Sequence, residues 1–263
     1  MKNKKTVIII ISIISAYLVL AIVLFGFDNL KNKFRHNTIM FSTGDKWKFE
    51  NGKWIDIKDN KKFEWENFDV YIDDKLIGNY DLLYNDKWYI YDKNSHLVKY
   101  DGRFLAISGN KNYKVIEFEE KNLNSSDENY IKAILRNKNI EYPDEFNYAK
   151  KVELDVDNDN KLETIYTVSN AFVIDNSSKK FSFVLIKDDE PQMLYEKYVE
   201  PDQKYKLCVP KMNSVIDFNK DSKYEIIIEC NYYSDIGTST NLYKQHKGKY
   251  ELVKGGKKHE IKD

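Results

Sequence analysis

The sequence has few of the residues that break regular structure and few of those that build the common catalytic motifs. Its 263 residues include only 10 glycines, 4 prolines, 4 histidines and 2 cysteines. A glycine-rich phosphate loop, a G-x-S-x-G nucleophile elbow and an H-E-x-x-H zinc motif do not occur in it. The histidines are too scattered for a zinc cluster or a catalytic triad. These absences argue against the commonest enzyme classes, so we expect a protein without catalytic activity.

The charges of the sequence balance, with 42 basic and 42 acidic residues. A nucleic-acid-binding protein usually carries a basic surplus, so no nucleic-acid partner is expected. Aromatic residues are abundant instead, with 20 tyrosines and 14 phenylalanines. Aromatic residues favour packed strands over disorder, so the composition indicates a mainly β fold.

The two cysteines, Cys208 and Cys230, both lie in apolar surroundings, KLCVP and IIIEC. Two cysteines are too few to indicate a disulfide scaffold. An extracytoplasmic location would permit a disulfide between them, but the preferred interpretation is two buried thiols that act as small apolar side chains.

Residues 7–27 form an apolar run without a charged side chain. At about 1.5 Å per helical residue, the run spans about 30 Å, the thickness of the hydrocarbon core of a bilayer. A cleavable secretory signal is the alternative, but its apolar region is shorter, about 7–15 residues, and ends at a small-residue site that FGFDNLKN does not offer. We therefore predict a cytoplasmic stub and transmembrane anchor over residues 1–27, in contact with membrane lipid through residues 7–27.

The charges that flank the apolar run indicate how the predicted helix is oriented across the membrane. Three lysines precede it, at positions 2, 4 and 5, and three basic residues follow it, at positions 31, 33 and 35. The first group is closer to the run and is joined by the N-terminal amine, which favours the N-terminus inside, and long domains cross membranes largely regardless of charge. We predict a single-pass protein of the cell membrane with an extracytoplasmic body.

Residues 28–45 are mixed and polar, which predicts a juxtamembrane spacer. Over residues 46–124, aromatic and β-branched runs alternate with turn pairs such as Asn51-Gly52 and Asp101-Gly102. Asn-Gly and Asp-Gly tolerate the positive φ angles that tight hairpins require. This region is therefore predicted to be an antiparallel β meander domain.

A single helix is predicted over residues 126–138. Ser125 as N-cap and Glu128 three residues later have the spacing of a capping box. Apolar residues then recur at helical spacing, namely Tyr130, Ile131, Ile134 and Leu135. The helix begins a second domain over residues 125–255, and residues 256–263 form a tail.

The second domain contains an internal repeat. Residues 151–170 and 213–232 align at a constant offset of 62, and each copy reads D-x-[DN]-x-D-x-x-x-E. A fixed period of this size indicates a duplicated supersecondary unit. Two units cannot close a propeller, so either the N-terminal meander supplies further blades or the C-terminal half is an open sheet or sandwich. The change of pattern at the helix favours two separate domains.

Both loops carry the oxygen ligands that calcium prefers, at alternate positions of a tight turn. The predicted ligands are the side chains of Asp155, Asp157, Asp159 and Glu163 with the carbonyl of Lys161 in the first loop, and the side chains of Asp217, Asn219, Asp221 and Glu225 with the carbonyl of Lys223 in the second. Four carboxylates against three predict tighter Ca2+ binding by the first loop. The alternative is two acidic turns without metal, because Asp and Asn favour turns. Four clustered carboxylates would, however, repel one another without a cation.

The loops differ from an EF-hand, because their twelfth position is Tyr166 or Ile228 where an EF-hand has Glu. A carboxylate at position 9 followed directly by an apolar strand resembles the short calcium loops of FG-GAP and VCBS-type repeats, as in integrin-α-like propellers. The resemblance covers residues 150–170 and 212–232. It implies calcium at each strand entry. The glycine of that family at position 6 is replaced by Asn160 and Ser222, and serine tolerates the left-handed conformation less well than asparagine.

Together these features predict a mainly β fold of the α+β kind, with a transmembrane helix, a β meander domain, one connecting helix and two repeated calcium-loop units. The expected function is that of a membrane-anchored extracytoplasmic protein with a calcium-stabilised β domain. It would serve as a binding or envelope-interaction module, with a protein or an envelope polysaccharide as partner. The alternative is a membrane-tethered hydrolase of an envelope polymer, which needs a cleft with two carboxyl groups of divergent pKa.

Overall fold

The computed structural model describes residues 37–50, 52–57, 63–85, 87–100, 102–108, 113–143, 146–173, 179–218, 221–232 and 237–255. The predicted anchor over residues 7–27 and the predicted tail over residues 256–263 lie outside these ranges. Within them, no helix has the length and apolar character needed to cross a membrane. The described strands form three antiparallel sheets, which confirms the mainly β prediction.

The N-terminal sheet, which we call sheet A, has the strand order β3-β2-β1-β8-β4-β5-β6-β7. Consecutive strands pair as hairpins, as the meander prediction requires, but β8 returns to lie between β1 and β4. Because β8 pairs with both β1 and β4, it joins strands β1–β3 and strands β4–β7 into one sheet. Its strands are β1 (Asn37–Phe41), β2 (Lys46–Glu50), β3 (Lys53–Asp56), β4 (Phe63–Ile72), β5 (Lys75–Asn85), β6 (Lys87–Tyr91), β7 (Leu97–Val98) and β8 (Phe104–Ser108).

The spacer predicted over residues 28–45 is wrong from residue 37 onward, where the chain forms β1 inside sheet A. Ile39 and Phe41 are buried in one core and Met40 in another, on the opposite face of the sheet. Three consecutive apolar residues are the pattern of a short strand covered on both faces. The polar composition of the surrounding segment concealed this run.

The two repeated units form the other sheets. The first unit supplies β11 (Tyr148–Leu154), β12 (Glu163–Ser169), β13 (Lys180–Lys187) and β14 (Gln192–Val199) to sheet C. After the 3-10 helix η1 (Pro201–Lys206), the second unit supplies β15 (Cys208–Asp217), β16 (Glu225–Tyr232), β17 (Thr238–His246) and β18 (Lys249–Gly255) to sheet B. Each unit is an antiparallel meander of four strands. The short strands β9 (Lys114–Ile116) and β10 (Lys121–Asn122) add one edge strand to sheet B and to sheet C, respectively.

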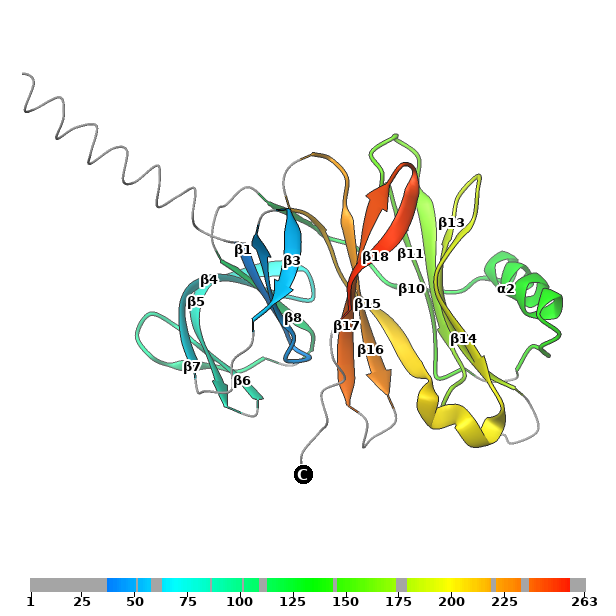
Figure 1. Cartoon of the computed structure of the whole chain (residues 1–263), viewed down its shortest axis with the longest axis horizontal. Helices are drawn as coiled ribbons and strands as arrows, with labels where there is room; N and C mark the ends of the chain where they lie inside the picture. Colours follow the sequence, from blue (N-terminus) through cyan, green and yellow to red (C-terminus); the bar gives the residue numbers. More distant parts are fainter. Residues whose placement is uncertain are drawn as a thin grey trace, which may run out of the picture.

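The molecule is layered, with sheet A, sheet B, sheet C and the helix α2 (Ser125–Asn137) in that order (Figure 1). Sheet B has an apolar core on each face: Ile227 of β16 packs with residues of sheet A, while Ile226 and Ile228 pack with residues of sheet C. A strand that is covered on both faces needs a continuous apolar run, and the sequence EIIIEC of β16 provides it. The two units therefore form a sandwich, and a continuous core joins sheet A to it.

The helix α2 lies within one residue of its predicted ends, but its N-cap is Asn124 instead of Ser125. The Asn124 side chain accepts the N–H groups of Ser126 and Asp127, and the Asp127 carboxylate accepts the N–H of Asn124. Asp127 also accepts the hydroxyl of Tyr166 at 2.8 Å and pairs with Lys151 at 3.0 Å, both from sheet C. These sheet contacts select Asp127 over Glu128 as the partner in the capping box.

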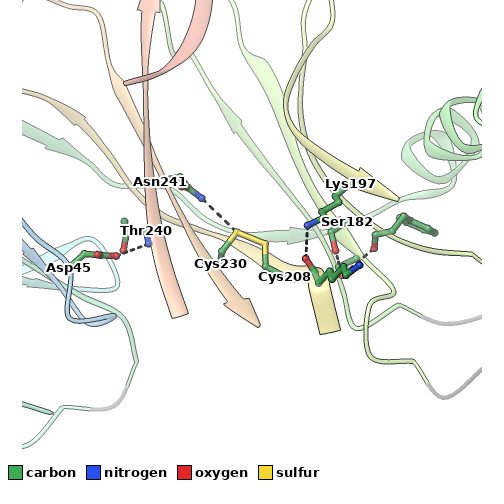
Figure 2. The surroundings of a disulfide bond; sticks show 10 residues. Asp45, Ser182, Lys197, Cys208, Cys230, Thr240 and Asn241 are labelled. Carbon is green, nitrogen blue, oxygen red and sulfur yellow. Dashed lines mark hydrogen bonds between the residues drawn. A yellow bond between two sulfur atoms is a disulfide. The ribbon is translucent and has the colours of Figure 1, made fainter. Parts of the chain in front are cut away.

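Cys208 and Cys230 form a disulfide between β15 and β16, so the preference for two free thiols is wrong (Figure 2). Cys230 lies opposite Pro210, two residues from Cys208, and the two Cα atoms are 5.2 Å apart. This separation lies within the range that a disulfide requires. The sequence could not predict it, because the pairing depends on the register of two strands.

A polar contact completes the junction of sheets A and B. The Asp45 carboxylate in the turn after β1 accepts the backbone N–H of Thr240 on β17 at 2.8 Å (Figure 2). The hydroxyls of Thr43 and Thr240 lie 2.6 Å apart. These buried hydrogen bonds satisfy polar groups at the edge of the apolar core between the sheets.

Candidate metal centre

Both acidic loops connect the first two strands of their units, the first between β11 and β12 and the second between β15 and β16. The loops are neighbours in space, with Tyr250 of β18 between them. Its hydroxyl donates to the carbonyl of Val156 at 2.8 Å. Burial raises the pKa of Tyr250, and carboxylates of both loops, Asp157 and Glu225 among them, raise it further. The structure therefore gathers the acidic residues of both repeats around one end of the sandwich.

The first loop folds around the Asp155 carboxylate, which accepts the backbone N–H of Asp159 at 3.1 Å and of Asn160 at 3.0 Å. Asn160 has the left-handed φ of 68° that the turn requires. The carboxylates of Asp155, Asp157 and Asp159 each offer an oxygen within 4.8 Å of the other two. In the described part of the chain, this is the acidic group close enough to share one metal ion.

Glu163 closes the first loop from the start of β12. Its carboxylate accepts the backbone N–H of Val156 at 2.8 Å, and the residue is only 4 % exposed. Burial raises the pKa of Glu163, and the nearby carboxylates of Asp157, Asp188 and Asp155 raise it further. A buried carboxylate surrounded by acids is an environment that a divalent cation would stabilise.

The second loop repeats this geometry bond for bond. Asp217 accepts the N–H groups of Asp221 at 3.1 Å and of Ser222 at 3.0 Å, and Glu225 accepts the N–H of Phe218 at 3.2 Å. Ser222 adopts a φ of 63°, at the position of Asn160 in the first loop. Both residues therefore adopt the left-handed turn conformation, in which glycine is the least strained residue. Asn219 lies outside the described residues.

The loops differ at one position on the neighbouring strand. In the second unit Lys244 of β17 lies opposite Glu225, with its ammonium 2.6 Å from that carboxylate and 3.9 Å from Asp221. In the first unit Thr164 lies opposite Lys187, so the next residue, Asp188, comes opposite Glu163. The second loop thus has an internal cation where the first has another acid.

Sequence reasoning missed both Asp188 and Lys244. Neither belongs to the repeated motif, and only the strand register brings them to the loops. Lys161 also places a cation near the first loop, 3.7 Å from Asp159 and 3.4 Å from Asp189, but its side chain is 65 % exposed. An exposed pair of this kind contributes little energy. The carbonyl ligands predicted for Lys161 and Lys223 stay predictions.

No known protein family, no curated protein and no solved structure matches this chain.

Proposed function

We propose that this protein is anchored in the cell membrane by residues 7–27 and that its extracytoplasmic β body, stabilised by calcium at the first acidic loop, serves as a binding or envelope-interaction module. The observation that carries the calcium assignment is the convergence of Asp155, Asp157 and Asp159 within 4.8 Å. Oxygen ligands from alternate residues of one tight loop are the chemistry that calcium selects. The metal is structural in this proposal and takes part in no reaction.

The ligand number supports calcium in the first loop. The three aspartates converge, and the predicted ligands Glu163 and the carbonyl of Lys161 would bring the protein oxygen donors to five, where calcium takes about six to eight. Asp188, opposite Glu163, or water completes the shell. The motif-level resemblance to FG-GAP and VCBS-type loops points to the same ion.

The second loop carries no calcium in this proposal. The Lys244 ammonium already lies on Glu225, and it neutralises the buried carboxylate that calcium would need. A divalent cation would have to displace this ammonium from Glu225. The displaced ammonium would then repel the cation, which weakens binding. Stoichiometry of one ion per chain follows.

Two observations support the extracytoplasmic location. The disulfide between Cys208 and Cys230 is typical of oxidising compartments. The apolar run over residues 7–27 has the length of a membrane span. Protease treatment of intact cells should therefore degrade the β body; a body that is cut only after the cells are lysed would refute this location.

The test of the calcium proposal is isothermal titration of Ca2+ into the full chain in lipid nanodiscs. We expect one site, weakened at least about 30-fold in Asp157→Ala, since one charged ligand is lost. Asp221→Ala removes a carboxylate group from the second loop, at the position that corresponds to Asp159, and is the control. Equal calcium heat in wild type and Asp157→Ala would refute the assignment.

The hydrolase alternative has less support. Burial raises the pKa of Asp74 to about 7, which suits an acid-base group, but Asp74 is only 6 % exposed. It does not line the cavity where the three sheets meet. A catalytic carboxyl group must reach its substrate, so the raised pKa of Asp74 alone does not favour an enzyme.

A further inference from the structure

A cavity of about 470 Å³ opens where the three sheets meet. Turns of sheet A, β15–β17 of sheet B and β11 of sheet C all contribute to its walls. A pocket at such a junction, with convergent polar groups, is the usual place for a small-molecule site. Its charged walls are three carboxylates, Asp73, Glu120 and Glu229, and two cations, Arg103 and Lys211.

Three of these charges already form ion pairs with one another. Arg103 lies 3.4 Å from Glu120 and 3.7 Å from Asp73. One guanidinium between two carboxylates leaves a net charge of −1 on that wall, which favours the positive end of a ligand. The charged groups without an ion pair lie on the opposite wall, formed by sheet B.

Lys211 and Glu229 lie on that wall, directly opposite each other on β15 and β16. Opposite charges at this position usually attract across the strands. Among the described residues, however, neither forms an ion pair within 4.0 Å. One carboxylate oxygen of Glu229 accepts bonds from Ser42 at 3.4 Å and Asn213 at 3.3 Å, while the Lys211 ammonium lies 5.2 Å from the centre of the Tyr148 ring.

The Tyr148 hydroxyl adds a third polar group to the cavity wall, close to the Glu120 carboxylate. Burial raises the pKa of Tyr148, and the carboxylate of Glu120 raises it further, so the hydroxyl keeps its proton and can donate it in a hydrogen bond. A ligand oxygen in line with this hydroxyl would accept a better-aligned hydrogen bond than Glu120 does.

We propose that this cavity binds a small zwitterion, such as an α-amino acid or a short peptide. The ligand carboxylate lies between the Lys211 ammonium and the Tyr148 hydroxyl, and the ligand ammonium lies on Glu229. A phosphate or another polyanion would meet three carboxylates, and a simple cation would meet Arg103 and Lys211. A molecule that carries both charges can pair with the Lys211 ammonium and the Glu229 carboxylate at the same time.

This inference deepens the binding role proposed above by naming its ligand class, and it does not depend on calcium. The test is calorimetric titration of the full chain in nanodiscs with each of the twenty protein amino acids and with dialanine. We expect at least one to bind, and its N-acetylated methyl amide, which lacks both charges, to bind at least tenfold more weakly. Binding should persist in Asp157→Ala, so failure of the calcium proposal and failure of this one are distinguishable.

Variants of Lys211 and Glu229 test the proposed contacts with the zwitterion. Lys211→Met and Glu229→Gln should each weaken zwitterion binding at least tenfold, while Lys211→Arg keeps the charge and stays within a few-fold of wild type. Lys249→Met, which removes an exposed lysine of β18, is the matched control. Equal melting temperatures would show that the variants are folded. The proposal is overturned if no amino acid or dialanine binds, if the capped amide binds equally, or if both charge-removing variants keep wild-type affinity.

Discussion

The two acidic loops have the same sequence pattern and the same hydrogen bonds but opposite electrostatic surroundings. In the first, Glu163 faces Asp188 and the loop aspartates; in the second, Glu225 faces the Lys244 ammonium at 2.6 Å. Both glutamates are buried and both have raised pKa values because of burial. Only around Glu225 does a neighbouring cation oppose this shift. In our proposal, this one residue on the adjacent strand decides which of the two loops binds calcium.

The same contrast extends along the two units. The second unit joins β15 and β16 through the disulfide of Cys208 and Cys230. At the offset of 62, the first unit has Phe146 and Val168, which pack in the core beneath α2. The second unit thus has a covalent bond between two of its strands. At the corresponding positions the first unit has apolar packing, and in our proposal it also holds a bound ion.

The largest effect is expected when the first loop receives a cation at the position where the second loop has Lys244. Asp188→Lys places an ammonium opposite Glu163 and should weaken calcium binding at least about 1,000-fold, or about 4 kcal/mol, because two unit charges change beside a divalent ion. Calorimetric titration measures it. Asp189→Lys makes the same change one residue away, at a side chain that is 88 % exposed, and should have a much smaller effect. Equal effects of the two variants would show that position 188 has no special role.

The reverse change should allow the second loop to bind calcium. Lys244→Met removes the internal cation and leaves Glu225 buried with its acidic neighbours. We expect a second, weak calcium site, which stabilises the variant by about 1.4 kcal/mol at a free calcium concentration ten times its dissociation constant. Thermal unfolding with and without calcium measures the gain. Lys223→Met removes an exposed lysine of the same loop and should create no site; a Lys244→Met protein that still binds one ion would contradict the role of Lys244.

The smallest expected effect is a pH dependence of the first loop. The pKa of Glu163 is raised above its ordinary value of 4.5 in the calcium-free fold. The folded state then binds this proton more tightly than the unfolded state, so the contribution of Glu163 to stability is greatest below about pH 4.5 and is lost as pH rises through the raised pKa. Calcium needs the ionised carboxylate, so its affinity should fall severalfold as pH is lowered through the same range. Titrations at several pH values measure it, and a flat profile would contradict it.

The sequence predicted what depends on local pattern. The alternating acidic residues located both loops, and the capping pattern located the helix to within one residue, although the overlapping cap residues of NSSDE gave the wrong N-cap. The two copies of the repeat lie in two four-stranded meanders, β11–β14 and β15–β18. The loop and helix signals each lie within a short window of the sequence, and each copy of the repeat spans 20 residues.

What the sequence did not predict depends on which strands become neighbours. The insertion of β8 between β1 and β4, the disulfide across β15 and β16, and the residues opposite Glu163 and Glu225 all follow from pairing register. A strand shifted by one residue would turn each of these side chains to the other face of its sheet. The cavity with Lys211 and Glu229 arises only where three sheets meet, so no local pattern could locate it.

The edge strand β9 has a consequence for how the chain folds. Its partner is β15, in which Ile216 pairs with Val115 about 100 residues earlier in the chain. One face of sheet A likewise stays uncovered until β16 and β17 supply Ile227 and Leu242. Contacts of such sequence separation form slowly, because the long loop must be closed first. During synthesis the apolar face of sheet A would therefore stand open until nearly the whole chain has emerged, and this interval is when the protein is most exposed to aggregation or most in need of a chaperone.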